Sequence, residues 1–261
     1  MVMPMTLTDR VYIVTGAGGG IGEGIAVAIL EQGGRVVLVD LSRDSVKAVA
    51  ERVDPGGSRT VAMHGDVTSA EDAQNAVQAA VEAFGRLDGV VNNAGVVTLD
   101  AAWDATPEAM DREFSINVTG SFVMAQAVGR HLRENGGGAV VNVASNCGKV
   151  GYKNMAGYNA SKAAVINLTR SLALEWAPDG INVNAVCPGG VDTPMLAGVA
   201  EWLSPRLGVG ADELLAGMGP AQLGRKVTPV EVGRVVAFLL SDAAVVIRGQ
   251  AINVDGGDTP Y

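Results

Sequence analysis

The feature that most constrains the fold is a regular alternation of short apolar runs with longer stretches of helical spacing. Runs such as residues 36–39 are apolar at consecutive positions, which is typical of strands covered on both faces in a parallel sheet. Strands are predicted at Val11–Thr15, Arg35–Asp40, Thr60–His64, Leu87–Asn92, Ala139–Ala144, Ile181–Cys187 and Gln250–Val254. Helices are predicted near residues 21–33, 43–53, 69–84, 107–134, 156–177 and 229–241. This order predicts one α/β domain over residues 1–261, a doubly wound parallel sheet with helices on both faces.

One long segment, residues 189–228, shows no clear periodicity. Such a segment in a compact domain is typically a lid or a binding loop, so we expect the substrate loop here. Its apolar residues, which include Met195 and Trp202, could close over a substrate and exclude water. The alternative is that they form only the packing of the lid itself.

Composition excludes several classes of protein. The 261 residues carry 28 acidic and 19 basic side chains, and a net charge of −9 argues against a general nucleic-acid binder. No apolar stretch approaches the ~18–20 residues of a membrane span, and the first ten residues lack a signal-peptide pattern. Two cysteines cannot build a disulfide framework, so the sequence favours a cytoplasmic protein. Without a membrane span, no membrane partner is expected.

The histidines and cysteines are isolated in the sequence. His64 and His131 lie in no metal-ligand cluster, so no metal site is predicted. Cys147 is expected to line a pocket or pack beside it, and a reactive thiol is the less favoured alternative. Cys187, which precedes a proline, is expected to be a small buried residue.

The first predicted strand ends in the glycine-rich turn TGAGGGIG at residues 15–22. Glycines allow the backbone to approach a pyrophosphate, which the N–H groups and positive dipole end of the next helix can bind. The strict Gly-x-Gly-x-x-Gly spacing is not met, and a tight turn without a ligand is the alternative. The candidate cofactor-binding residues of this turn are Gly16, Gly19, Gly20, Ile21 and Gly22.

Asp40 ends the second predicted strand. A carboxylate at this place can accept hydrogen bonds from both ribose hydroxyls of NAD and would repel the 2′-phosphate of NADP. NADP would favour a basic residue in the glycine turn or directly after Asp40, where Gly19 and Leu41 stand. The sequence therefore predicts NAD, with a strand-end cap as the alternative role of Asp40.

Two further strand ends carry candidate cofactor contacts. Asp66 and Val67 follow the third strand and could bond the amino edge of adenine. Small residues follow the fourth strand and are expected to lie against the cofactor: Asn93, Ala94 and Gly95.

Tyr158 and Lys162 are four residues apart in a predicted helix, so they share a face. Free tyrosine, with a pKa near ~10, is a poor base at neutral pH, but a nearby ammonium and a cationic nicotinamide would lower that pKa. Tyr158 could then take the proton of an alcohol while hydride leaves its carbon, or protonate a ketone in reverse. Ser145, at the end of the fifth strand, could hold the same oxygen. Asn117 could hold a water that links Lys162 to solvent.

The chain resembles the short-chain dehydrogenase/reductase family, and the resemblance covers nearly its whole length. The matching positions are the Thr15–Gly22 turn, Asp66, Asn92–Gly95, Asn117, Ser145, Tyr158, Lys162, Pro188-Gly189, Thr193 and Asp255–Gly257. The resemblance implies a seven-stranded Rossmann fold, nicotinamide chemistry on a small-molecule substrate, and usually a homotetramer paired through two long helices. It also implies cofactor contacts from Tyr158 and Lys162 and, after the sixth strand, from Pro188, Gly189, Val191 and Thr193.

The predicted helix at 156–177 is apolar on nearly all sides, so one side is expected to pack on the sheet and the other on a second subunit.

The substrate pocket is expected to come from the segments after strands four and five and from residues 190–219. Candidate lining residues are Val97, Cys147, Tyr152, Met195 and Trp202, while Asn146, Lys149, Lys153 and Asn154 could bond substrate hydroxyls or face water. Residues 192–195, the long loop and Asp40 are similar to the NAD-dependent polyol and acetoin/butanediol group of the family. The first hypothesis is therefore oxidation of a small polyol, sugar alcohol or diol. The alternatives are reduction of a 3-oxoacyl thioester on a carrier protein, and a non-catalytic NAD-binding sensor.

Overall fold

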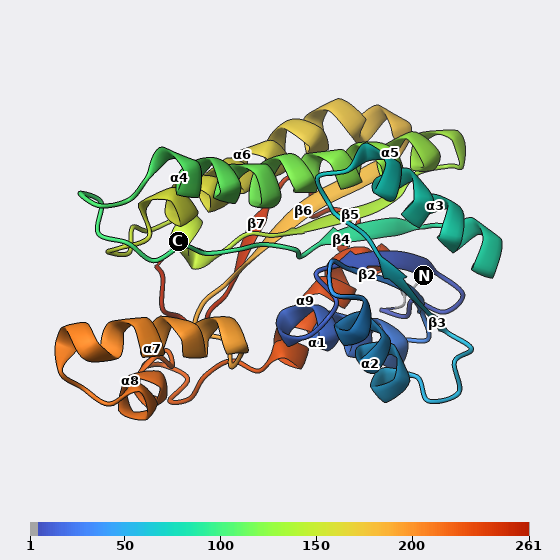
Figure 1. Ribbon diagram of the computed structural model, residues 1–261. Coiled ribbons are helices and arrows are strands. Elements are labelled where there is room, and N and C mark those ends of the chain that lie inside the picture. The colour runs from blue at the N-terminus through green and yellow to red at the C-terminus, as the bar shows by residue number, and fades with distance from the viewer. Residues whose placement is uncertain (1–4, 261) are drawn as a thin grey trace.

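The computed structural model describes residues 5–260 and contains a seven-stranded parallel sheet (Figure 1). The strands are β1 (Val11–Thr15), β2 (Arg35–Asp40), β3 (Thr60–His64), β4 (Gly89–Asn92), β5 (Gly138–Val143), β6 (Ile181–Pro188) and β7 (Ala251–Val254). Their order across the sheet is β3-β2-β1-β4-β5-β6-β7, so the winding reverses between β1 and β4. The predicted doubly wound α/β fold is confirmed.

Helices cover both faces of the sheet (Figure 1). One face carries α1 (Gly20–Glu31), α2 (Arg43–Val53) and α9 (Pro229–Leu240), and the other carries α3 (Ala70–Phe84), α4 (Pro107–Phe114), α5 (Ser121–Glu134) and α6 (Ala156–Trp176). Val14 packs in the core under the first group, whereas its neighbour Ile13 packs under the second. Successive strand residues point to opposite faces, which explains why the runs are apolar at every position.

The predicted helix at 107–134 is interrupted, which corrects the expectation of one continuous helix. Between α4 and α5 the chain forms a π-helical segment, Ser115–Gly120. A side chain at Gly120 would place its Cβ 2.6 Å from Cγ2 of Val67, so the backbone approaches the β3–α3 connection closely here. Such wider turns are frequent at functional sites, and this one contains the candidate residue Asn117.

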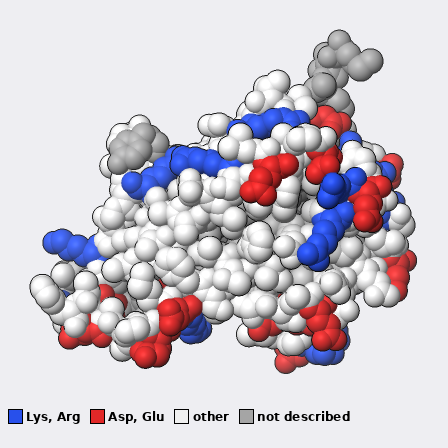
Figure 2. All heavy atoms as spheres, turned by 90° about the horizontal axis from the view of Figure 1, so that it is seen from above, with Lys and Arg blue, Asp and Glu red and all other residues white. Residues whose placement is uncertain are grey.

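The outer face of α6 is more polar than its sequence predicted. Asn167, Arg170, Ser171 and Glu175 are exposed together with Leu174, which keeps 80% of its surface accessible. Figure 2, the view from above, shows a broad area without charged side chains between groups of blue and red ones. A subunit interface on this face stays a prediction.

The segment 189–228 is largely helical, which corrects the expectation of an irregular loop. It contains α7 (Pro194–Leu207) and α8 (Ala211–Gly217). Thr193 caps α7 through its side chain, and Gly208 ends the helix in the left-handed conformation. A parallel bridge between Val191 and Val227 joins the two ends of the segment, so α7 and α8 project from one narrow base. We refer to residues 192–226 as the helical lid.

Within residues 5–260 no helix is long and apolar enough to cross a membrane.

Candidate active site

A cavity of about 940 Å³ opens at the carboxyl ends of the strands, beside the helical lid. The glycine turn, the end of β2 and the segment after β4 line one part of it. The segment after β5, the start of α6 and α7 line the rest. In open α/β sheets, ligands bind at this edge where the strand order reverses. The position therefore suits a dinucleotide.

The glycine turn forms a cradle that side chains would fill. Gly16 and Gly20 have φ angles of 62° and 55°, which side-chain-bearing residues rarely adopt. Gly22 lies behind the turn, where an added Cβ would sit 2.2 Å from the carbonyl oxygen of Gly16. Gly16, Gly19, Gly20 and Ile21 face the cavity at the N-terminal end of α1. This geometry fits a pyrophosphate at the positive end of a helix.

Asp40 lines the cavity and its carboxylate is held in place by the backbone. Oδ2 accepts the N–H of Gly18 and Oδ1 accepts the N–H of Ser42, both at 2.8 Å. Each oxygen keeps a lone pair for a ribose hydroxyl. The basic side chains that line the cavity, Lys153 and Lys162, come from elements after β5 and not from the glycine turn or β2. These residues fit the adenosine ribose of NAD.

The other predicted cofactor residues divide into two groups. Asn93 donates from Nδ2 to the carbonyl oxygens of Thr15 and Gly16, both at 3.0 Å, and so ties β4 to the glycine turn. The cavity lining contains Asn93, Ala94, Gly95, Pro188, Gly189, Val191 and Thr193. Asp66 and Val67 lie outside this lining. Asp66 accepts hydrogen bonds from Thr68, and its contact with adenine stays a prediction.

Ser145, Tyr158 and Lys162 meet in the cavity, as the sequence predicted. Ser145 follows β5, and the other two lie on the first turns of α6. Lys162 Nζ lies 5.7 Å from the centroid of the Tyr158 ring and donates to the carbonyl oxygen of Val143 at 2.9 Å. An added Cβ at Gly148 would sit 2.7 Å from the carbonyl carbon of Lys162, so this glycine lets the post-β5 segment pack on α6.

Burial dominates the electrostatics of these three residues. Lys162 is only 4% exposed, and desolvation lowers its pKa to about 8. Burial also raises the pKa of Tyr158, the Cys147 sulfur raises it further, and the hydrogen bond with Ser145 acts in the opposite direction. The expected lowering of the Tyr158 pKa by Lys162 is therefore not seen in the protein alone. A positive charge brought in by a nicotinamide ring would act in the lowering direction.

Asn117 is buried behind the cavity, not in its lining. Its Nδ2 donates to the Val96 carbonyl oxygen and to Ser161 Oγ, both at 3.0 Å, and its Oδ1 accepts the Val96 N–H at 2.8 Å. An added Cβ at Gly95 would sit 3.1 Å from Asn117 Oδ1 and 3.3 Å from Lys162 Nζ. Asn117 thus braces the post-β4 segment against α6 close to the lysine. Its role in holding a water stays a prediction.

Four of the five predicted substrate-pocket residues line the cavity: Val97, Cys147, Tyr152 and Met195. Trp202 does not, because its ring packs against the Arg206 guanidinium, 3.5 Å from the ring centroid. The lid instead contributes one apolar face of α7: Leu196, Val199, Leu203 and Leu207. Their spacing of three and four residues is the signal of this face, and Pro205 within the same stretch obscures the helix.

Two polar residues complete the substrate end of the cavity. Asn146 was one of several candidates for bonding hydroxyls, and it faces the cavity. Asp258 was not predicted at all, and it also lines the cavity, from the chain after β7. The signal that could have found it is its position two residues after the Asp255–Gly256 pair, at the carboxyl end of a parallel strand. Lys149 faces elsewhere and donates to the carbonyl oxygen of Ala251.

In the part of the chain from 5 to 260, no cluster of three or more His, Cys, Asp or Glu side chains could hold a metal ion.

Comparison with known proteins places this geometry among nicotinamide oxidoreductases. A family profile described as Enoyl-(Acyl carrier protein) reductase matches residues 16–259. An NAD-dependent glycerol dehydrogenase of Listeria innocua is 40% identical, over 97% of this chain and 95% of the relative. A D-threitol dehydrogenase of Mycolicibacterium smegmatis is 38% identical, over 97% of this chain and 94% of the relative. A crystal structure of an actinorhodin polyketide ketoreductase with NADPH superposes with a TM-score of 0.91 at 36% identity, covering 97% and 98% of the two chains.

Proposed function

The chain belongs to the short-chain dehydrogenase/reductase family of oxidoreductases, and from this premise we propose that it interconverts a secondary alcohol and a ketone with NAD(H). The observation that carries the proposal is the meeting of Ser145, Tyr158 and Lys162 in one cavity with the glycine cradle. A chain that only sensed NAD would not need a proton donor at the substrate end. This feature favours an enzyme over the alternative of a non-catalytic sensor.

The residues of the cavity have separate tasks in this reaction. Bound nicotinamide supplies the hydride acceptor or donor. Ser145 holds the reacting oxygen by a hydrogen bond, and the phenol of Tyr158 exchanges a proton with that oxygen. Lys162, whose ammonium lies beside the tyrosine ring, favours the tyrosinate when it is charged. The apolar face of α7 covers the cavity and limits access of water.

The cofactor preference is proposed to depend on Asp40. We expect Asp40→Ala to raise kcat/KM with NADP⁺ relative to NAD⁺ by about tenfold or more, because it removes a carboxylate that repels the 2′-phosphate and bonds both ribose hydroxyls. Initial rates with the two cofactors measure this ratio. An unchanged ratio would show that Asp40 serves only to cap the end of β2 through the N–H groups of Gly18 and Ser42.

A small polyol, sugar alcohol or diol is the proposed substrate. Two relatives that match nearly the whole chain carry the names glycerol dehydrogenase and D-threitol dehydrogenase. The polar group of Asn146, Tyr152 and Asp258 at the substrate end supports a substrate with more than one hydroxyl. The second candidate is a 3-oxoacyl thioester on a carrier protein. The description of the matching profile also names an acyl carrier protein, but for an enoyl group and not for a 3-oxoacyl group. The net charge of −9 weighs against docking of an acidic carrier.

The experiment that tests the proposal is initial-rate NAD⁺ reduction by the purified protein at mildly alkaline pH. The panel contains glycerol, threitol, 2,3-butanediol, a 3-hydroxyacyl thioester and a hydroxysteroid, with Tyr158→Phe as the blank. We expect turnover of at least one diol or polyol. Turnover of the thioester alone would favour the second candidate, and NAD binding without any turnover would favour the sensor.

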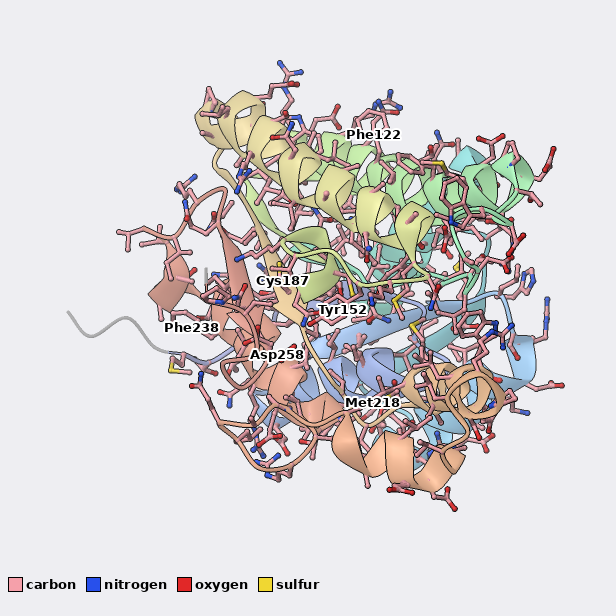
Figure 3. The ribbon with its side chains drawn as sticks, turned by 90° about the vertical axis from the view of Figure 1, so that its left-hand side faces the viewer. Phe122, Tyr152, Cys187, Met218, Phe238 and Asp258 are labelled. Carbon is pink, nitrogen blue, oxygen red and sulfur yellow. The ribbon has the colours of Figure 1, made fainter. Side chains whose placement is uncertain are left out.

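We further propose a homotetramer in the cytoplasm, paired through the face that carries α5 and α6. Leu174 on α6 is exposed, and Phe122 on α5 projects from the same layer of helices (Figure 3). We expect Leu174→Glu to convert the tetramer into smaller species in sedimentation velocity, because a carboxylate would be buried in the interface. Val81→Glu on the exposed side of α3 is the matched control. A tetramer that persists in Leu174→Glu would place the interface elsewhere.

A further inference from the structure

Asp258 brings a carboxylate into the substrate end of the cavity (Figure 3). It lies in the segment after β7, far in sequence from Asn146 and Tyr152 in the segment after β5. Tyr152 donates from its hydroxyl to Asp258 Oδ2 at 2.7 Å, and Asn146 donates from Nδ2 to the same oxygen at 3.0 Å. Asn146 Nδ2 also lies 3.0 Å from the Tyr152 hydroxyl, so the three groups form a closed set.

Both protein bonds to this carboxylate reach the same oxygen atom. Among the described residues, no side chain hydrogen-bonds to Oδ1 of Asp258. A carboxylate accepts at both oxygens, and bonds to a charged acceptor are about twice as strong as neutral ones. Burial and the bond to Asp258 both raise the pKa of Tyr152, so the phenol stays protonated and remains a donor. Asp258 is an exposed residue at the mouth of the cavity, so its Oδ1 is an acceptor that a substrate hydroxyl can take over from water.

A continuous chain of hydrogen bonds connects this acceptor to the reacting centre. Ser145 Oγ donates to Asn146 Oδ1 at 3.3 Å, and Asn146 then donates to Asp258. Asp258 is thus one side chain away from the hydroxyl that holds the reacting oxygen. A substrate whose reacting oxygen lies at Ser145 can direct a neighbouring hydroxyl toward Asp258, because Asn146 bonds both residues.

We propose that Asp258 determines specificity by accepting a hydrogen bond from a second, non-reacting hydroxyl of the substrate, adjacent to the carbon that is oxidised. The inference rests on the proposed function, since it names a feature of the alcohol that the same site takes. It distinguishes vicinal diols and polyols from simple secondary alcohols. An alcohol without the second hydroxyl would bring no donor to Oδ1.

A purely structural role of Asp258 makes a different prediction. In that case the carboxylate only ties the segment after β7 to the segment after β5. Loss of its charge would then affect all alcohols alike, because Tyr152 and Asn146 would shift for every substrate. The specificity role and the structural role are distinguished by comparing kcat/KM for a diol with kcat/KM for a simple alcohol on the same carbon skeleton.

The test measures kcat/KM with NAD⁺ for 2,3-butanediol and for 2-butanol, in the wild type and in Asp258→Asn. Asp258→Asn keeps one side-chain oxygen for Tyr152 but removes the charge. We expect the wild type to prefer the diol, and we expect Asp258→Asn to lower kcat/KM for the diol about tenfold or more, as for other hydrogen bonds to charged groups. The rate with 2-butanol should change by less than about twofold. Asp242→Asn, an exposed carboxylate at the opposite end of the sheet that pairs with Arg10, is the matched control.

The outcomes are distinguishable. The specificity role of Asp258 is overturned if the wild type oxidises both alcohols and Asp258→Asn lowers kcat/KM equally for both, or for neither. The proposed function then stands. If the wild type oxidises neither alcohol nor any other polyol, the proposed function fails and the inference fails with it. Retained cooperative thermal unfolding of Asp258→Asn would show that a selective loss does not come from misfolding.

Discussion

Tyr158→Phe is expected to lower kcat for alcohol oxidation by about 10²–10⁴-fold, the range that a positioned acid or base contributes. The change removes one oxygen atom from a ring that lines the cavity and leaves its packing in place. The lost hydroxyl is the group that exchanges a proton with the substrate oxygen. Initial rates at saturating NAD⁺ and substrate measure the effect.

The affinity for NAD should stay nearly constant in this variant, because the glycine cradle and Asp40 are untouched. Quenching of protein fluorescence by the cofactor measures that affinity. Tyr152→Phe is the matched control. It removes a phenol hydroxyl from the same cavity, but one that we assign to substrate binding and not to proton transfer. A kcat for Tyr158→Phe close to that of the wild type would assign the proton transfer to another group.

Lys162→Met is expected to abolish most of the activity and to raise the free energy of unfolding at pH 7. Lys162 is only 4% exposed, and desolvation lowers its pKa from the usual 10.5 to about 8. A difference of this size corresponds to ~3 kcal/mol that burial of the charge costs the folded state. The substitution removes this cost but also removes the hydrogen bond to the Val143 carbonyl oxygen, which destabilises the folded state by about 1 kcal/mol. We therefore expect a net gain of about 2 kcal/mol.

The pH dependence of this gain has a definite sign. Below pH 8 the lysine is charged in both the folded and the unfolded protein, so the full cost of burial is present. Between pH 8 and 10.5 the folded protein releases the proton first, and the wild type becomes more stable as the pH rises. The difference between Lys162→Met and the wild type should consequently shrink across that window.

Urea unfolding at pH 7 and at pH 10 measures both free energies. Lys153→Met, a change at an exposed lysine that lines the same cavity, is the control and should alter stability little. A less stable Lys162→Met at pH 7 would mean that the ammonium contributes more to the fold than its burial costs.

The sheet could be predicted closely from sequence because its strands are buried on both faces. Each observed strand lies within two residues of its predicted bounds, since consecutive apolar positions mark such strands directly. The helical lid could not be predicted in the same way. Pro205 lies inside α7, and α8 has only seven residues, so neither produces a long periodic pattern.

The candidate site could be predicted where it depends on local chain order and less well where distant segments meet. Tyr158 and Lys162 share one helix, so their proximity follows from spacing. Asp258 meets Tyr152 only because β7 lies at the edge beside β6, and no local pattern contains that contact. Trp202 was expected in the cavity because it is hydrophobic. Its position around the axis of α7 instead places its ring against the Arg206 guanidinium.

The narrow base of the helical lid makes that segment an exchangeable module. The bridge between Val191 and Val227 brings its two ends together, with the N–H of Val227 bonding the Gly190 carbonyl oxygen at 2.9 Å. A replacement segment of different length or shape would therefore meet the scaffold at the same two adjacent points. The glycine cradle and Asp40 lie on other elements, so a replacement that keeps Thr193 would leave them unaffected. Replacement of the helical lid can therefore change the substrate specificity of such a chain during evolution, while the glycine cradle and Asp40 stay the same.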